Sequence, residues 1–149
     1  MEMLVAVRME RRLYIVSGTP EDELQRILAR RGMTAYFDGV YGSPRLKEEI
    51  VETVLAHHGV APGDTLFVDD AMTDYRAARN TGVPFVGRVA ASWSNPFPSG
   101  TAVIADMMGL AAFAHCAAWE LLLGRCVQPG APSRSWHYLG RRLRIVYQD

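Results

Sequence analysis

The sequence predicts an α/β fold built on a doubly wound parallel sheet, and three observations support this prediction. Short apolar, partly β-branched runs at residues 13–16, 65–68 and 83–86 are typical of buried parallel strands. Segments with helical spacing of their apolar residues lie between these runs. The chain of 149 residues is 49% hydrophobic and 21% charged, which is the composition of one ordinary globular domain.

The first strand, residues 13–16, is expected to lead directly into a helix. Thr19 suits the N-cap and Pro20 suits the first helical position. Three acidic residues follow in the first turn, where the helix dipole favours negative charge. Gly32 suits the end of this helix because glycine readily adopts the left-handed conformation found there.

The alternation of strands and helices continues along the chain. We expect helices over residues 44–58 and 71–80, strands over 65–68 and 83–86, and a last strand and helix at 102–105 and 106–114. No clear periodicity continues beyond this point. The sequence therefore predicts a core domain over residues 1–114 and a C-terminal extension of uncertain structure over residues 115–149.

Charge and cysteine content exclude several classes of protein. Sixteen basic and sixteen acidic residues give a formal net charge of zero, which argues against a nucleic-acid or anionic-membrane partner. The spacing of Cys116 and Cys126 indicates neither a zinc site nor a disulfide scaffold. No secretory signal is evident, and the apolar residues 107–124 are interpreted as a buried helix rather than a membrane span, so we predict a cytoplasmic protein.

Ser17 follows the first predicted strand, at the edge of a parallel sheet where ligands gather. Its hydroxyl, with the backbone N–H groups of Gly18 and Thr19, suits a phosphoryl oxygen near a helix N-terminus. A Ser-Gly turn with a threonine cap explains the same residues without a ligand. The segment on its own leaves both interpretations open.

Asp70 and Asp74 lie four residues apart where a predicted strand meets a helix. This spacing lets one carboxylate coordinate Mg²⁺ while the other orients the metal or its waters. Capping of the helix by Asp69 or Asp70 is the alternative, because aspartate is a preferred N-cap residue.

Lys47 is the only lysine among sixteen basic residues, the others being arginine. An ammonium group is a compact charge that can be directed at one phosphate oxygen, unlike the fork of a guanidinium. Lys47 is therefore a candidate phosphate ligand, and a solvated helix face is the alternative.

Taken together, residues 13–19 (LYIVSGT), 36–47 (YFDGVYGSPRLK) and 66–74 (LFVDDAMTD) resemble the haloacid dehalogenase superfamily of phosphatases. The resemblance covers about residues 11–112, contains three of the family's four motifs in order, and is greatest to small bacterial phosphoglycolate-phosphatase-like members. It implies Mg²⁺-dependent hydrolysis of a small phosphorylated metabolite through an aspartyl-phosphate intermediate.

The resemblance also implies roles for individual residues. Ser17 would hold the phosphoryl group with Gly18 and Thr19, and Lys47 would neutralise the charge of the nucleophile and the phosphate. Asp70 and Asp74 would bind or position Mg²⁺.

The sequence departs from the family pattern in two ways. Asp69 stands where the family usually has glycine, and residues 1–16 contain no aspartate, so the D-x-D-x-T/V motif of the nucleophile is absent. We therefore expect an N-terminally truncated core whose central strand, between those ending at Ser17 and Asp69, is missing. Such a sheet would have two unpaired inner edges. The chain alone would then not hydrolyse a substrate. If it is instead a non-catalytic remnant, a strand from a protein partner would complete the sheet.

Two other functions remain as alternatives. One is a non-catalytic phosphate- or partner-binding remnant of the fold. A phospho-accepting receiver domain also uses aspartates, Mg²⁺, a hydroxyl residue and a lysine, but there the aspartates come first, whereas here Ser17 and Lys47 precede them.

Overall fold

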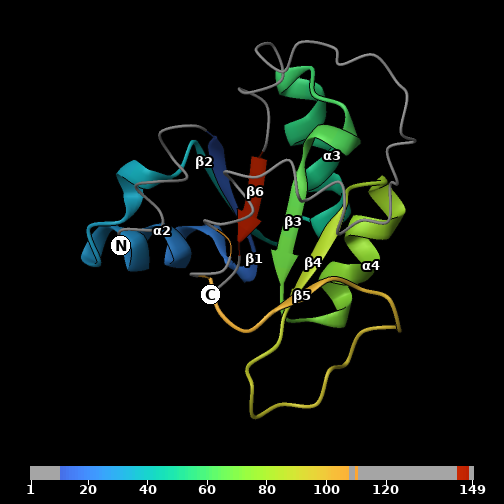
Figure 1. The fold of residues 1–149 in the computed structure, drawn as a ribbon. Coiled ribbons are helices and arrows are strands. Elements are labelled where there is room, and N and C mark those ends of the chain that lie inside the picture. The colour runs from blue at the N-terminus through green and yellow to red at the C-terminus, as the bar shows by residue number, and fades with distance from the viewer. Residues whose placement is uncertain (1–10, 108–109, 111–143, 148–149) are drawn as a thin grey trace.

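A computed structural model describes residues 11–107, 110 and 144–147 of the chain. Its centre is a six-stranded parallel sheet with the order β2-β1-β6-β3-β4-β5 (Figure 1). The strands are β1 (Arg12–Pro20), β2 (Gly39–Ser43), β3 (Leu66–Asp69), β4 (Phe85–Arg88), β5 (Val103–Ile104) and β6 (Arg144–Tyr147). The helices are α2 (Glu21–Arg30), α3 (Lys47–His58) and α4 (Met72–Thr81), with 3₁₀ turns η1 (Thr34–Tyr36) and η2 (Pro62–Asp64). The predicted α/β fold with a parallel sheet is confirmed.

Helices cover both faces of the sheet, α2 on one side and α3 with α4 on the other (Figure 1). Successive strand residues point to opposite faces, so each strand contributes to both cores. In β3, Leu66 and Val68 pack in the core on the α2 side, whereas Phe67 packs among residues of α3 and α4. The same alternation determines to which face the side chain at the end of each strand points.

The predicted elements of the core are found with small shifts in their bounds. The first helix begins at Glu21, with Pro20 as its N-cap, so the expected cap at Thr19 was wrong by one residue. The second helix begins at Lys47 rather than at residue 44. Strand β2 was not predicted, because two of its five residues are glycine, which has a low preference for strands.

The position of the missing central strand is occupied in the structure. Strand β6, from the end of the chain, lies between β1 and β3 and pairs in parallel with both (Figure 1). Val146 is the partner of Tyr14 on one side and of Phe67 on the other. The expectation of two unpaired inner edges was therefore wrong, because a segment distant in the sequence supplies the backbone hydrogen-bonding groups that both edges require.

Several predicted features lie outside the described residues. These are most of the helix expected over residues 106–114, most of the apolar stretch 107–124, both cysteines, and the arginine-rich segment before β6. Within the described part of the chain, no helix combines the length and apolar character needed to cross a membrane.

Candidate functional site

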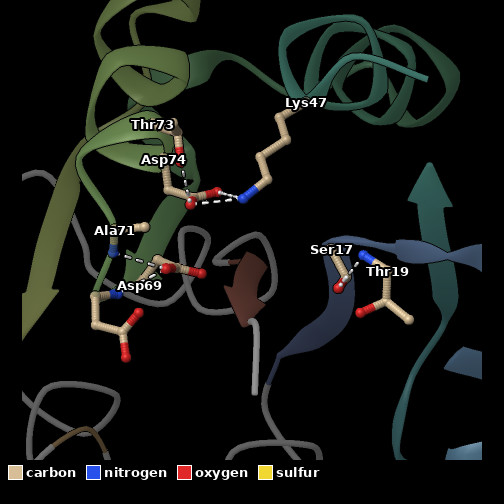
Figure 2. A network of polar contacts seen from close by, with 8 residues as sticks. Ser17, Thr19, Lys47, Asp69, Ala71, Thr73 and Asp74 are labelled. Atoms are coloured by element: carbon tan, nitrogen blue, oxygen red, sulfur yellow. Dashed lines mark hydrogen bonds and ion pairs between the residues drawn. The ribbon is translucent and has the colours of Figure 1, made fainter. Parts of the chain in front are cut away.

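The predicted site residues lie at the carboxyl edge of the sheet. Ser17 lies in β1 directly after Val16, where the regular pairing with β2 shifts, and Asp69 is the last residue of β3. Lys47 is the first residue of α3, and Asp74 lies in the first turn of α4. Because parallel strands end at the same edge, these elements direct the four side chains toward one region (Figure 2).

Lys47 and Asp74 form the strongest polar contact of this region. The Lys47 Nζ lies 2.6 Å from each carboxylate oxygen of Asp74 and donates a hydrogen bond to Oδ2. Asp74 is fully buried, and the side chain of Lys47 is only 18% exposed. The Thr73 hydroxyl donates a further bond to Asp74 Oδ2 at 3.3 Å. A buried carboxylate needs such partners, so Lys47 is held toward the site rather than toward solvent.

Ser17 is buried, with 3% of its surface exposed. Its Oγ accepts a hydrogen bond of 3.1 Å from the backbone N–H of Thr19, which closes a tight turn around the exposed Gly18 (Figure 2). The Thr19 N–H is therefore engaged by Ser17, and the Ser17 hydroxyl can still donate its hydrogen to another group. The turn is compatible with a phosphate contact, because the turn uses a lone pair of Ser17 Oγ and the phosphate contact would use the hydroxyl hydrogen.

Asp69 and Asp70 have different surroundings although they are adjacent. Asp69 follows Phe67 by two residues and therefore points to the face covered by α3 and α4, where Lys47 and Asp74 lie. Asp70 instead forms an ion pair with Arg88 at the end of β4, with side chains 36% and 31% exposed. The structure thus brings Asp69, rather than Asp70, next to Lys47 and Asp74.

The Asp69 carboxylate is only partly satisfied by hydrogen bonds. Its Oδ1 accepts bonds from the N–H groups of Asp70 at 2.7 Å and Ala71 at 3.0 Å, which lead into α4 (Figure 2). Its Oδ2 is buried and finds no donor among the residues that the structure describes. Burial, and next the negative charge of Asp74, raise the pKa of Asp69 from 3.8 to about 7, although Lys47 and the two N–H bonds oppose this rise.

Sequence reasoning did not include Asp69 among the site residues. It gave capping of the helix by Asp69 or Asp70 as the alternative to a metal role, but the N-cap of α4 is Ala71 and no side chain caps it, so the Asp69 Oδ1 bonds belong to the turn before the helix. The available signal was the alternation along β3, which separates Asp69 from Asp70 by face. That signal is useful only once the face covered by α3 and α4 is known.

The buried carboxylates of Asp69 and Asp74 are compatible with Mg²⁺. Mg²⁺ prefers oxygen ligands and is usually held by one or two carboxylates, with waters and phosphate oxygens completing the octahedron. The unpartnered Asp69 Oδ2 is an oxygen for which a cation would be a suitable partner. Among the described residues there is no group of three or more His, Cys, Asp or Glu side chains placed to hold a metal, so the protein part of this site would be these two carboxylates.

A family model of haloacid dehalogenase-like hydrolases matches residues 2–88, which is more than half of the chain. The chain belongs to the haloacid dehalogenase-like hydrolase family. The match includes β1, α3 and β3, and with them Ser17, Lys47, Asp69 and Asp74.

Solved structures of hydrolases from this family have the same fold. A haloacid dehalogenase-like family hydrolase from Streptococcus pneumoniae superimposes with a TM-score of 0.64 at 20% identity, over 75% of this chain and 56% of that protein. A predicted phosphoglycolate phosphatase from Haemophilus somnus gives 0.66 at 22% identity, over 75% of this chain and 54% of that protein. A phosphatase of the family from Thermococcus onnurineus superimposes with a TM-score of 0.65 at 22% identity, over 77% of this chain and 56% of that protein.

These similarities establish the fold of the chain. The chain spans a little over half the length of each of these proteins, so their full architecture extends beyond what is matched here. No protein with curated function matches the chain.

Proposed function

We propose that this hydrolase acts on phosphomonoesters of small metabolites with Mg²⁺ as cofactor, and that the described core supplies the phosphate- and metal-binding half of the site. The observation that carries this proposal is the Lys47–Asp74 pair beside the buried Asp69 at the carboxyl edge of a parallel sheet. Ammonium and hydroxyl donors next to paired carboxylates are the groups that a phosphate dianion with a divalent cation requires.

Each residue has a task in this proposal. The Ser17 hydroxyl donates to one phosphoryl oxygen, while its Oγ keeps the Thr19 N–H as a positioning bond. Lys47 places its positive charge near the transferring group, and Asp74 orients that ammonium. The carboxylates at the ends of β3 and in α4 would hold Mg²⁺, which when bound offsets the negative charge on phosphate oxygens. The sequence assigned this metal role to Asp70 and Asp74.

The attacking group is the part of the reaction that the chain lacks. Residues 1–16 contain no aspartate, and in the family an aspartate of this region attacks phosphorus. Positioning and charge stabilisation cannot replace a covalent nucleophile in this mechanism. We therefore expect the chain to bind phosphate with Mg²⁺ without hydrolysing a phosphomonoester.

Calorimetric titration of inorganic phosphate into the full chain with Mg²⁺ tests the binding half of the proposal. Binding should be weakened by about tenfold or more in Lys47→Met, because an ammonium–phosphate contact is charge-assisted. The exposed Arg26→Met variant, which removes a similar charge from α2, should leave it unchanged. Equal phosphate affinity of the wild type and Lys47→Met would contradict the proposal.

Assays with p-nitrophenyl phosphate test the second half of the proposal, which concerns hydrolysis. The chain alone should give no turnover. An N-terminal fragment of a family member that ends its strand in D-x-D-x-T/V would have to displace β6 from between β1 and β3, and where it does so, co-expression should give Mg²⁺-dependent hydrolysis that is lost in Lys47→Ala. Turnover by the chain alone, if it persists in repeated preparations and disappears in Lys47→Ala, would show that another residue attacks phosphorus.

A non-catalytic binding protein is the second candidate, and one observation favours it. Strand β6 already fills the space between β1 and β3 in which a completing strand would pair. Phosphate binding together with failure of every N-terminal fragment to displace β6 would support this function over the enzyme.

A further inference from the structure

Asp69 and Asp70 follow one another at the end of β3, and only one of them faces the site. Alternation along the strand places Asp69 on the face of Phe67, where α3 brings Lys47 and α4 brings Asp74. Asp70 points to the other face and is paired with Arg88. Because the Arg88 guanidinium already contacts Asp70 Oδ2, a cation bound by this carboxylate would lie beside another positive charge.

The turn between β3 and α4 accounts for only half of the Asp69 carboxylate. Oδ1 accepts the N–H groups of Asp70 and Ala71, which precede the helix, and the N-cap of α4 is Ala71 without a side-chain cap bond. Oδ2 is buried without a donor among the described residues, although Asp69 is only 3% exposed. A serine would accept the same N–H groups in this turn without leaving a carboxylate oxygen buried and unsatisfied.

The charges around Asp69 also favour a cation. Asp69 and Asp74 carry two potential negative charges, and the Lys47 ammonium is bound to Asp74, 2.6 Å from both of its oxygens. Lys47 directly contacts Asp74 and also lies near Asp69, so one positive charge is shared between two carboxyl groups. A divalent cation between the two carboxylates would supply further positive charge and the missing partner of Oδ2.

We infer that Asp69, at the position where the family usually has glycine, is the ligand from the end of β3 that holds the divalent cation together with Asp74. Asp70 is then not a metal ligand but a positioning residue, whose ion pair with Arg88 ties the end of β3 to the end of β4. This inference rests on the proposed function, since the cation is the one that the phosphatase would use.

Binding of Mn²⁺ to the full chain, followed by the loss of the electron paramagnetic resonance of free Mn²⁺, tests the inference directly. Asp69→Asn should weaken Mn²⁺ binding by about tenfold or more, because it removes a charged ligand. The matched variant Asp70→Asn, one residue away, should bind within about threefold of the wild type. Asn keeps an oxygen for the N–H groups of Asp70 and Ala71, so the start of α4 is preserved.

A second variant and a second measurement guard against a folding defect. Asp69→Ser retains an oxygen for the turn before α4 and should lose Mn²⁺ affinity as Asp69→Asn does. Mg²⁺ should raise the melting temperature of the wild type and of Asp70→Asn but not of the two Asp69 variants. Circular dichroism confirms that each variant is folded before binding is compared.

The outcomes separate this inference from the proposed function. Loss of Mn²⁺ binding in Asp70→Asn with wild-type binding in Asp69→Asn overturns the inference and restores Asp70 as the ligand, leaving the phosphatase proposal intact. Wild-type binding in both variants also overturns the inference. No Mn²⁺ binding by the wild type at millimolar concentration overturns both the inference and the metal requirement, whereas phosphate titration still tests the role of Lys47.

Discussion

At the scale of the residue, the buried carboxyl of Asp69 makes stability depend on pH. The unfolded carboxyl ionises near 3.8, whereas the folded one keeps its proton until about 7. The folded state therefore binds the proton more tightly, and the free energy of unfolding falls as pH rises through this window and levels off above it. Without divalent cations, Asp69→Asn should thus be more stable than the wild type at about pH 8, with a much smaller difference at about pH 4.

Thermal unfolding followed by circular dichroism in EDTA measures this difference. Asp22→Asn, an exposed carboxylate of α2 paired with Arg26, is the control and should show little change at either pH. A stability difference between Asp69→Asn and the wild type that is the same at both pH values would contradict the assignment of this titration to Asp69.

Lys47 is the second residue whose removal has a clear physical consequence. Lys47→Met leaves the fully buried Asp74 without its ammonium partner, and we expect a loss of about 2 kcal/mol in the free energy of unfolding. The double variant Lys47→Met with Asp74→Asn should recover part of this loss, because no charge then remains buried. Urea denaturation measures the free energy of unfolding of both variants. Equal destabilisation of the single and double variants would show that lost packing, rather than an unpaired buried charge, is responsible.

At the scale of the element, the contact between β2 and the β1–α2 junction holds the Ser17 turn in place. The N–H of Gly42 in β2 donates to Glu21 Oε2 at 3.1 Å, and Glu21 also pairs with Arg45 at 3.1 Å. A Cβ at Gly42 would lie only 2.4 Å from the carbonyl oxygen of Thr19. Glycine at this position therefore permits the close approach of β2 to the end of β1.

Gly42→Ala should push β2 away from this junction and cost about 2 kcal/mol or more in the free energy of unfolding. Phosphate affinity should fall as well, because the displaced Thr19 is bonded to Ser17. Gly63→Ala is the matched control, since a Cβ there has no atom within 4 Å. Equal stability of the two variants by urea denaturation would show that the junction relaxes without strain.

At the scale of the whole molecule, β6 joins two halves of the sheet. Strands β2 and β1 lie on one side of it and β3, β4 and β5 on the other, so the sheet is continuous only through residues 144–147. Proline has no N–H and is not tolerated within a strand paired on both sides. We expect Val146→Pro to break the pairing with both β1 and β3.

Loss of this pairing should lower the melting temperature strongly and, through the two exposed edges, promote self-association. Val146→Ile keeps a β-branched residue and serves as the control. Thermal unfolding and size-exclusion chromatography measure the two effects. A Val146→Pro protein that unfolds and elutes as the wild type does would contradict the central position of β6.

The sequence by itself determined the local elements and three of the residues at the site. Strands β1, β3 and β4 and the three helices follow from apolar periodicity and end signals that act over a few residues. Ser17 was predicted from its place after a parallel strand, Asp74 from its spacing to Asp70, and Lys47 as the only lysine, and the structure places all three at one edge of the sheet. The helices and strands depend on contacts between residues close in the sequence, which are visible in a linear pattern, whereas the Lys47–Asp74 contact joins residues 27 positions apart.

The tertiary structure alone decided which aspartate faces the site and what fills the centre of the sheet. Alternation predicts that Asp69 and Asp70 point to opposite faces of the sheet. Only the packing of α3 and α4 on one face places Asp69 near Lys47 and Asp74. On the other face, Asp70 forms an ion pair with Arg88. Likewise, no local pattern places residues 144–147 between β1 and β3. Strand pairing over a long stretch of chain depends on which edges remain open after the rest of the sheet has formed, and the sequence of one strand does not contain that information.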